Sequence, residues 1–363
     1  MNAGKTQARK KLCGTDRRVQ TIASSNNCNP IPMSNPASHR MTPNASPASV
    51  PALRSMESLI ARASELPPVR TAVVHPCDRL SLGGALDARE AGVIEPVLVA
   101  PEARLRAVSE EAGLELGGCK IVDVPHSHAA AACAAAMAGR GEVQALMKGS
   151  LHTEEYLAAI LDPAVGLRTE RRLSHCYLMQ TAAYPYPFII TDAAINIAPT
   201  LQVKADIVRN AIDLAHVIGV AVPRVAILSA VETVNPRMPS TLDAAALCKM
   251  ADRGQISGGV LDGPLAFDNA VSPEAALTKN IISEVAGRAD ILVVPDMTSG
   301  NMLAKQLEYM GHADSAGIVM GAQVPVVLTS RSDSRRTRLA SCAIALLLAR
   351  YSRGAVIPDL AEA

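Results

Sequence analysis

Short apolar runs alternate with longer amphipathic stretches from about residue 50 to near the C-terminus. The short runs are bounded by turn residues, which is typical of strands buried on both faces of a parallel sheet. They predict strands at 69–75, 96–100, 121–124, 143–147, 187–191, 225–229, 259–261, 291–294 and 324–329. The longer stretches predict helices at 103–112, 129–138, 154–160, 202–218, 242–251, 273–286 and 336–348. This alternation predicts an α/β fold with mainly parallel sheets.

Residues 1–50 differ from the rest, because they are rich in Lys, Arg, Ser, Asn and Pro and have little periodic apolar content. We expect a disordered tail there. The segment starts basic but lacks the apolar run of a signal peptide, and a transit peptide is the alternative. A length of 363 residues suggests two domains. The sequence has no long apolar run free of charged residues, so we expect no membrane-spanning helix.

Composition narrows the classes of partner. Trp is absent and Phe occurs only 2 times, so the core must be aliphatic and aromatic platforms for nucleic acid are excluded. The net charge of +1 gives no general attraction to nucleic acid or to an anionic membrane. The 8 cysteines contain no C-x-x-C pair and no zinc-ligand spacing, which indicates reduced, buried thiols in a cytoplasmic protein.

Small polar residues follow five of the predicted strands. Ligands of parallel sheets bind beyond the carboxyl ends of the strands, so these five turns together predict one site. The turns contain Lys148, Gly149, Ser150, His152 and Thr153; Asp192 and Asn196; Glu232 and Thr233; Ser299, Gly300 and Asn301; and Ser330, Arg331, Ser332, Asp333 and Ser334.

The last of these turns precedes the helix predicted from Arg336. Unpaired amides at a helix N-terminus bind anions, and the planar guanidinium of Arg331 suits phosphate. The turn is therefore a candidate cradle for a phosphate or a thioester. The alternative is an ordinary Ser/Asp helix cap beside a surface arginine.

The other turns leave alternatives open. Gly149 would let backbone amides approach a phosphate, but the P-loop spacing is missing and a plain turn is the alternative. His152 is a general acid or base, or a capping or supporting residue. Asp192 and Asn196 orient the same region, or cap the turn before the next helix. A basic cluster around Arg168 would hold a phosphorylated ligand, or is a solvated patch paired with Glu170.

Six segments together resemble the phosphate acetyltransferase and phosphate butyryltransferase family, from about residue 68 to the C-terminus. They are Met147-Lys148-Gly149, Gly166-Leu167-Arg168-Thr169, Arg172-Leu173-Ser174-His175, the string 191–200, Pro295-Asp296 with Gly300-Asn301, and the string 329–334. The string 191–200 is similar to the butyryltransferase-type branch. The resemblance implies a two-domain, three-layer αβα fold shared with isocitrate and isopropylmalate dehydrogenases. Residues 51–165 and 325–363 would form domain I and residues 166–324 domain II, with the active cleft between them, in a homodimer or higher homo-oligomer.

The resemblance also implies the reaction, in which phosphate attacks acyl-CoA directly in a ternary complex to give acyl phosphate and CoA. No metal and no cofactor are implied, since the coenzyme A thioester is a substrate. Ser330 would contact the thioester and Arg331 the phosphate. The family's acetyltransferase branch has an aspartate where this chain has Thr337, so Asp333 becomes the candidate base. Substrate-binding roles fall to Lys148, Gly149, Ser150, His152, Thr153, Arg168, Asp192, Asn196, Ser299, Gly300, Asn301, Ser332 and Ser334.

Several functions remain open from the sequence. We favour acetyl-CoA as the substrate over a C3–C4 acyl-CoA, the substrate of a phosphate butyryltransferase. An NAD-dependent decarboxylating dehydrogenase on the same fold is a rival, although no tight pair of metal-binding aspartates opens a helix. A non-catalytic sensor of acyl phosphate or CoA is another, because of Thr337. No nucleic-acid or membrane partner is expected.

Overall fold

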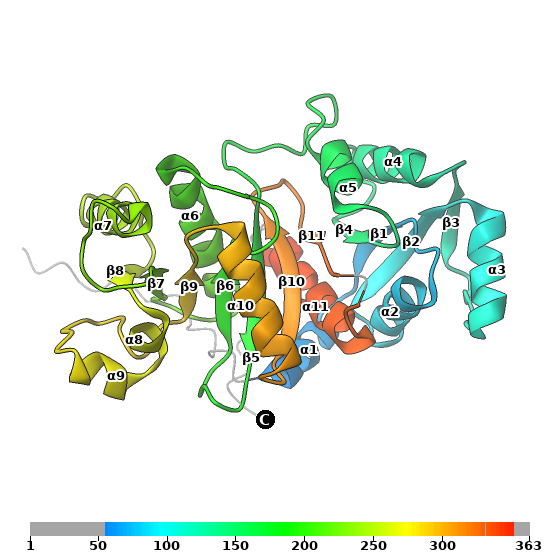
Figure 1. Cartoon of the computed structure of the whole chain (residues 1–363). Coiled ribbons are helices and arrows are strands. Elements are labelled where there is room, and N and C mark those ends of the chain that lie inside the picture. Colours follow the sequence, from blue (N-terminus) through cyan, green and yellow to red (C-terminus); the bar gives the residue numbers. More distant parts are fainter. Residues whose placement is uncertain (1–54, 331, 352–363) are drawn as a thin grey trace, which may run out of the picture. The chain divides into compact units, whose positions relative to one another are not determined.

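The computed structural model describes residues 55–330 and 332–351, which form one sheet with helices on both faces (Figure 1). The strands are β1 (Val69–Val74), β2 (Ile94–Ala100), β3 (Lys120–Asp123), β4 (Ala145–Lys148), β5 (Ser174–Gln180), β6 (Phe188–Thr191), β7 (Arg224–Leu228), β8 (Val260–Leu265), β9 (Ile291–Val293), β10 (Asp314–Met320) and β11 (Val326–Val327). The helices are α1 (Met56–Ser64), α2 (Arg79–Glu90), α3 (Glu102–Ala112), α4 (Ser127–Gly139), α5 (Thr153–Ile160), α6 (Leu201–Val217), α7 (Pro239–Asp252), α8 (Phe267–Val271), α9 (Pro273–Thr278), α10 (Met297–Tyr309) and α11 (Arg335–Tyr351).

The strand order is β3-β2-β1-β4-β11-β10-β5-β6-β9-β7-β8. The pairs β11–β10, β10–β5 and β5–β6 are antiparallel, and the other pairs are parallel. The predicted α/β fold with a mainly parallel sheet is confirmed. Because the antiparallel pairs lie in the middle, β1–β4 and β11 run in the opposite direction to β6–β9.

Apolar side chains pack on both faces of the sheet. On one face, α1, α2, α3, α6, α7 and α11 share a single cluster with strands from both ends of the sheet, including Val73 of β1 and Val225 of β7. On the other face, α4 and α5 cover β1, β2 and β4, while α8 and α10 cover β6, β7 and β9. Burial of these faces supplies most of the driving force for folding.

The nine predicted strands are present, with ends shifted by a few residues. Strands β5 and β10 were not predicted, nor were helices α1, α2, α8 and α10. The helix predicted at 273–286 is wrong beyond Thr278, where Asn280 takes a left-handed backbone with φ 55. A left-handed residue cannot continue a right-handed helix.

The predicted tail 1–50 lies outside the described residues. The division into domains I and II, with a cleft between them, stays a prediction. None of the helices in the described part of the chain has the length and apolar character that crossing a membrane requires. The six cysteines described there are free, and burial raises the pKa of the Cys176 and Cys342 thiols to about 12.

Candidate active site

The turn between β11 and α11, which we call the Ser330 turn (residues 330–334), is closed by its own polar groups. The Ser330 amide donates to Oδ2 of Asp333 at 2.7 Å, and the Asp333 amide donates to the Ser330 carbonyl at 3.2 Å. The Ser330 and Ser332 hydroxyls are 3.1 Å apart. Ser330 is half-buried and Ser332 is exposed, so both of these hydroxyls are accessible. Arg331 lies outside the described residues.

Asp333 is the buried carboxylate of this turn, with 2% exposure. Its Oδ1 lies 3.6 Å from Nζ of Lys305 on α10 and has no hydrogen-bond partner within the described part of the chain. Burial raises the pKa of Asp333, although the hydrogen bond from Ser330 and the charge of Lys305 oppose the rise. The carboxylate thus supports the backbone of the turn while one of its oxygens stays unsatisfied.

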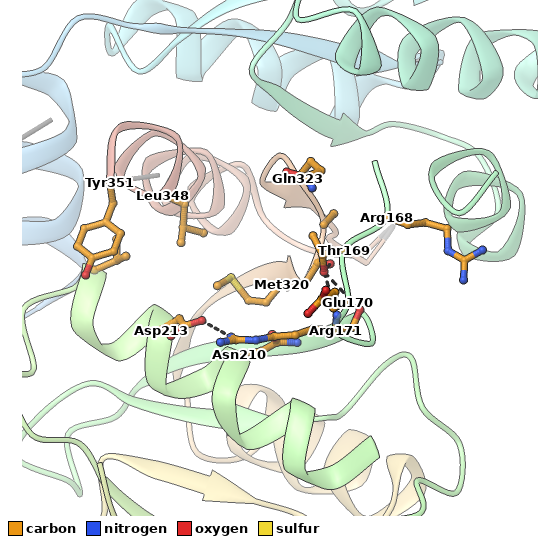
Figure 2. A pocket seen from close by; sticks show the side chains of 13 residues that line it. Arg168, Thr169, Glu170, Arg171, Asn210, Asp213, Met320, Gln323, Leu348 and Tyr351 are labelled. Carbon is orange, nitrogen blue, oxygen red and sulfur yellow. Dashed lines mark hydrogen bonds and ion pairs between the residues drawn. The ribbon is translucent and has the colours of Figure 1, made fainter. Parts of the chain in front are cut away.

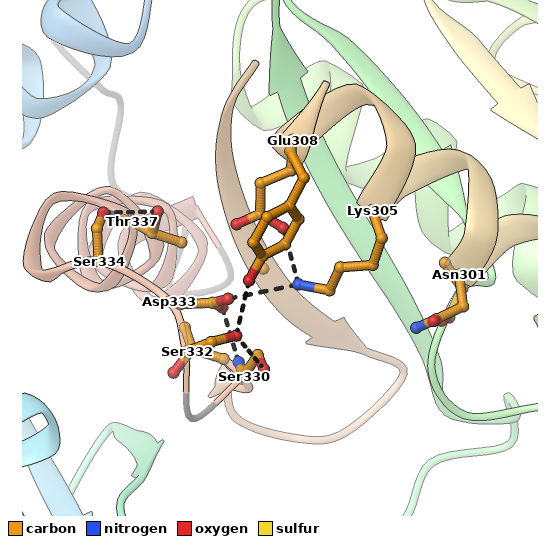
Figure 3. A network of polar contacts seen from close by, with 12 residues as sticks. Asn301, Lys305, Glu308, Ser330, Ser332, Asp333, Ser334 and Thr337 are labelled. Carbon is orange, nitrogen blue, oxygen red and sulfur yellow. Dashed lines mark hydrogen bonds and ion pairs between the residues drawn. The ribbon is translucent and has the colours of Figure 1, made fainter. Parts of the chain in front are cut away.

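Lys305 and Tyr309, in the C-terminal half of α10, contact Asp333 and Ser332 of the Ser330 turn (Figure 3). Nζ of Lys305 donates to Glu308 at 2.7 Å, and the Tyr309 hydroxyl donates to Oγ of Ser332 at 3.2 Å. Burial acts to lower the pKa of Lys305, but the hydrogen bond to Glu308 and nearby negative charges outweigh it, so that the pKa is raised. Lys305 therefore remains a cation beside Asp333.

Ser334 caps α11. Its hydroxyl accepts the Thr337 amide at 3.0 Å and lies 3.0 Å from the Thr337 hydroxyl, so the Thr337 side chain is used in the cap. The helix begins at Arg335, one residue before the predicted start. For Ser334, these bonds match the capping alternative.

The turn after β4 lies on the same edge of the sheet as the Ser330 turn, because β4 pairs with β11. The amides of Gly149 and Ser150 donate to the carbonyls of Val74 and His75 at 2.9 Å each, and are therefore already satisfied. A Cβ atom at Gly149 would lie 2.4 Å from the Val74 carbonyl oxygen, which explains the glycine by close backbone packing. Lys148 is buried, at 4% exposure.

His152 and Thr153 begin α5 farther along the same loop. His152 is the exposed N-cap residue and lines a pocket of about 510 Å³ together with His128 and Glu155. Its side chain forms no capping hydrogen bond, so His152 holds the N-cap position without acting as a side-chain cap, and its predicted role in substrate binding stays a prediction.

Asp192 organises the turn after β6. Its Oδ1 accepts the amides of Ala194 and Ile195 at 3.0 and 3.1 Å. Its Oδ2 accepts Nδ2 of Asn196 at 2.6 Å, and that amide also donates to Leu173. These bonds match the predicted capping alternative, and they satisfy a carboxylate that is only 2% exposed.

The N-terminal end of α10 packs on the Asp192 turn. Nδ2 of Asn301 donates to the Ala193 carbonyl at 3.2 Å, and a Cβ atom at Gly300 would lie 3.0 Å from the Asp192 carbonyl oxygen. Ser299 instead bonds Asp296, the N-cap of the helix. Helix α10 therefore joins the Asp192 turn at its start to the Ser330 turn at its end.

Arg168 lies at another edge of this region, opposite Ala322 in an isolated β-bridge. It lines a pocket of about 790 Å³ (Figure 2) and a second pocket of about 300 Å³, which it shares with Arg172 and Asn196. Arg171 pairs with Asp213 and not with the predicted Glu170. Neither Arg168 nor Arg172 forms an ion pair with any residue in 55–330 or 332–351.

The five turns do not meet at one sheet edge, which corrects the reasoning from parallel strands. The turns after β4 and β11 lie on one edge, whereas those after β6, β7 and β9 lie on the other, because the middle strands reverse the direction. The strand ends do not bring the Asp192 turn and the Ser330 turn together, but helix α10 contacts both of them.

Four residues near these turns were not among the predicted site residues. Lys305 and Tyr309 follow Asn301 at intervals of four, a spacing that places all three on one helix face and could have revealed them. Arg338 donates from Nη1 to Thr329 and from Nη2 to the Ser330 carbonyl, both at 2.8 Å. His175 on β5 lies 3.2 Å from the Leu328 carbonyl oxygen, and burial lowers its pKa.

All of these turns lie in the part of the chain that matches known proteins. The family model for phosphate acetyl/butaryl transferase matches residues 124–346. A phosphate acetyltransferase of Rhizobium meliloti is 60% identical over 301 residues, covering 83% of this chain and 95% of the relative. A phosphate butyryltransferase of Clostridium acetobutylicum is 39% identical over 297 residues, covering 82% and 99%.

A solved structure supports the same assignment. The branched-chain phosphotransacylase from Enterococcus faecalis V583 superposes with a TM-score of 0.69 at 31% identity, covering 77% of this chain and 99% of that one. The family model's matched residues, 124–346, include every turn described above, and Arg331 is among them. The chain therefore belongs to the phosphate acetyl/butaryl transferase family.

Proposed function

We propose that this phosphate acyltransferase transfers an acetyl group between coenzyme A and phosphate. The observation that carries the choice of acyl group is the greater identity to the relative named phosphate acetyltransferase, 60% against 39% for the one named phosphate butyryltransferase. Both relatives are covered almost completely, so the difference is not an effect of alignment length. A butyryl or other C3–C4 substrate is the second candidate.

The proposed chemistry is centred on the Ser330 turn. The hydroxyl of Ser330 would donate to the thioester oxygen or to the departing thiolate, and Arg331 would bind the attacking phosphate. The half-buried position of Ser330 and its supported backbone favour this role, because pre-aligned donors stabilise charge as it develops. Phosphate would attack the thioester carbon, the carbon–sulfur bond would break, and the sulfur would take a proton as CoA leaves.

Asp333 is the proposed proton acceptor, but the contacts of its carboxylate also support a second role. Oδ2 is used by the Ser330 amide, and Oδ1 faces Lys305. A carboxyl group whose pKa is raised by burial is a better base than an exposed one. Positioning of phosphate by Arg331 would leave little further need for a base.

Arg168 and Arg172 are proposed to bind phosphate groups of coenzyme A. Their guanidinium groups have no ion-pair partner within residues 55–330 and 332–351, and they share a pocket with Asn196. Since Arg168 lies near the start of β11 and Ser330 beyond its end, a long ligand would be needed to reach both. The extended shape of coenzyme A meets that requirement. The homodimer, the cytoplasmic location and the absence of a cofactor stay predictions.

Release of free thiol from acetyl-CoA, propionyl-CoA and butyryl-CoA in the presence of phosphate tests the proposal. We expect the highest kcat/KM with acetyl-CoA, and no release when phosphate is omitted. One or two methylene groups in an apolar pocket alter specificity by about 10–200-fold, so the ranking should be clear. A preference for butyryl-CoA would establish the second candidate, and no phosphate-dependent release from any of the three would leave the sensor as the better reading.

A further inference from the structure

Arg338 lies on the buried side of α11, directly beneath the Ser330 turn. Its side chain is 2% exposed, and its two terminal nitrogens donate to Thr329 and to the Ser330 carbonyl at 2.8 Å each. A buried guanidinium is costly unless its donors are satisfied and opposite charges are near. Nη1 donates to the Thr329 hydroxyl and Nη2 to the Ser330 carbonyl, so the buried cation ties the residue before the turn to the first residue of the turn.

The charged groups that face Arg338 come from two elements. Burial lowers the pKa of Arg338, and the carboxylates of Asp333 in the turn and Asp78 before α2 oppose this. Ser330 is thus fixed from two sides, since its amide is bound by Asp333 and its carbonyl by Arg338. A backbone fixed at both polar groups sets the direction of the Ser330 Cα–Cβ bond, from which the hydroxyl is carried.

Helix α2 provides the space for this arginine. A Cβ atom at Gly84 would lie 2.6 Å from Cδ and 3.0 Å from Cβ of Arg338, so any side chain there would displace the arginine. The preceding Gly83 faces Arg335 instead, and a Cβ atom there would lie 3.3 Å from Nε, near the end of a flexible side chain. Two adjacent glycines on one helix therefore differ in the arginine that they contact.

We propose that Arg338 is a positioning residue for acyl transfer, fixed in place by the absence of a side chain at Gly84. Arg338 does not touch the reacting atoms but aims the Ser330 hydroxyl at them. Small displacements of an aligned group are expensive, and a shift of about 1 Å can cost roughly 100-fold in rate. The proposal rests on the proposed function, because it takes Ser330 as the group that contacts the thioester.

Gly84→Ala and Gly83→Ala form a matched pair of variants, in which no residue of the Ser330 turn and no arginine is itself substituted. We expect Gly84→Ala to lower kcat about tenfold or more with little change in the KM for phosphate, because alignment is lost and binding is not. Gly83→Ala should stay within about twofold of the unchanged protein. Arg338→Lys, which keeps the charge but not the forked geometry, should recover part of the activity that Arg338→Met loses.

Hydrogen–deuterium exchange of peptides spanning 329–334 reads the turn without an activity assay. We expect faster exchange in Gly84→Ala and Arg338→Lys than in Gly83→Ala, with thermal unfolding showing that all three are folded. Unchanged exchange and unchanged kcat in Gly84→Ala would overturn the proposal, as would equal losses in both glycine variants. If the unchanged protein transfers no acyl group, the proposed function fails, while the exchange result still decides whether Arg338 holds the turn.

Discussion

Arg331 is the side chain on which the proposed binding of phosphate depends most directly. A guanidinium binds phosphate through two parallel charge-assisted hydrogen bonds, which strengthen as negative charge builds up. We expect Arg331→Ala to lower kcat/KM by about 100-fold or more, as removal of one such donor commonly does. The rate of thiol release from acetyl-CoA measures this change in kcat/KM. Arg336→Ala is the control, since Arg336 is exposed and pairs with Glu57 and Asp314; equal losses in the two variants would contradict the assignment.

Asp333 predicts a dependence of stability on pH. Burial raises its pKa above the ordinary 3.8, so the folded state binds this proton more readily than the unfolded chain. Its contribution to stability is then greatest below 3.8 and is lost as pH rises through the folded-state pKa. We expect Asp333→Asn, which lacks this loss, to gain stability relative to the unchanged protein as pH rises over that window.

Urea unfolding midpoints of the two proteins at several pH values measure that difference. Asp252→Asn is the control for removal of a carboxylate at an exposed position, since Asp252 lies at the end of α7 with 60% side-chain exposure. A difference between Asp333→Asn and the unchanged protein that stays constant with pH would show that burial does not govern this carboxyl group.

At the scale of elements, α10 connects two turns that the sheet keeps on opposite edges. Asn301 bonds the Asp192 turn, and Lys305 and Tyr309 bond or pair with the Ser330 turn (Figure 3). Loss of the ammonium group would leave Asp333 without its cation on this side and weaken its hold on the Ser330 amide. We expect Lys305→Met to lower kcat about tenfold, equivalent to roughly 1.4 kcal/mol of transition-state stabilisation.

Lys249→Met is a matched control for that variant. Lys249 also pairs with a carboxylate three residues later, at 2.6 Å against 2.7 Å for Lys305, but it lies on α7, away from the Ser330 turn. Its kcat should be unchanged. A similar fall in both variants would assign the effect to the local helix pair and not to Asp333.

Strands β5 and β10 show why two elements escaped prediction. Ser174 and His175 open β5, and Gly317 interrupts β10, so neither strand reads as a continuous apolar run. Yet a Cβ atom at Gly317 would lie 2.6 Å from the Leu328 carbonyl oxygen and 2.9 Å from Nε2 of His175. The residues that spoil the pattern are therefore those that tertiary contacts require.

At the scale of the whole molecule, one apolar cluster crosses the predicted domain boundary. It contains Val73 of β1, Val225 of β7 and Leu346 of α11, and the sheet continues through β10 and β5. Unfolding of either half of the molecule would expose the apolar residues that the other half contributes to this cluster. We therefore expect secondary structure and thiol-release activity to be lost at the same urea concentration. Two separate transitions, followed by circular dichroism and by activity, would instead support the division into domains I and II.

The sequence by itself determined what depends on neighbours in the chain: most strands and helices, the Ser330 turn before a helix, and the segments that resemble the family. Periodicity, caps and turn residues act over a few positions, so they can be read directly. Only the tertiary structure decided the reversal between the two halves of the sheet, the bridging role of α10, and the contact of Gly84 with Arg338. Those features join residues more than a hundred positions apart, and a one-dimensional pattern carries no record of which distant side chains will meet.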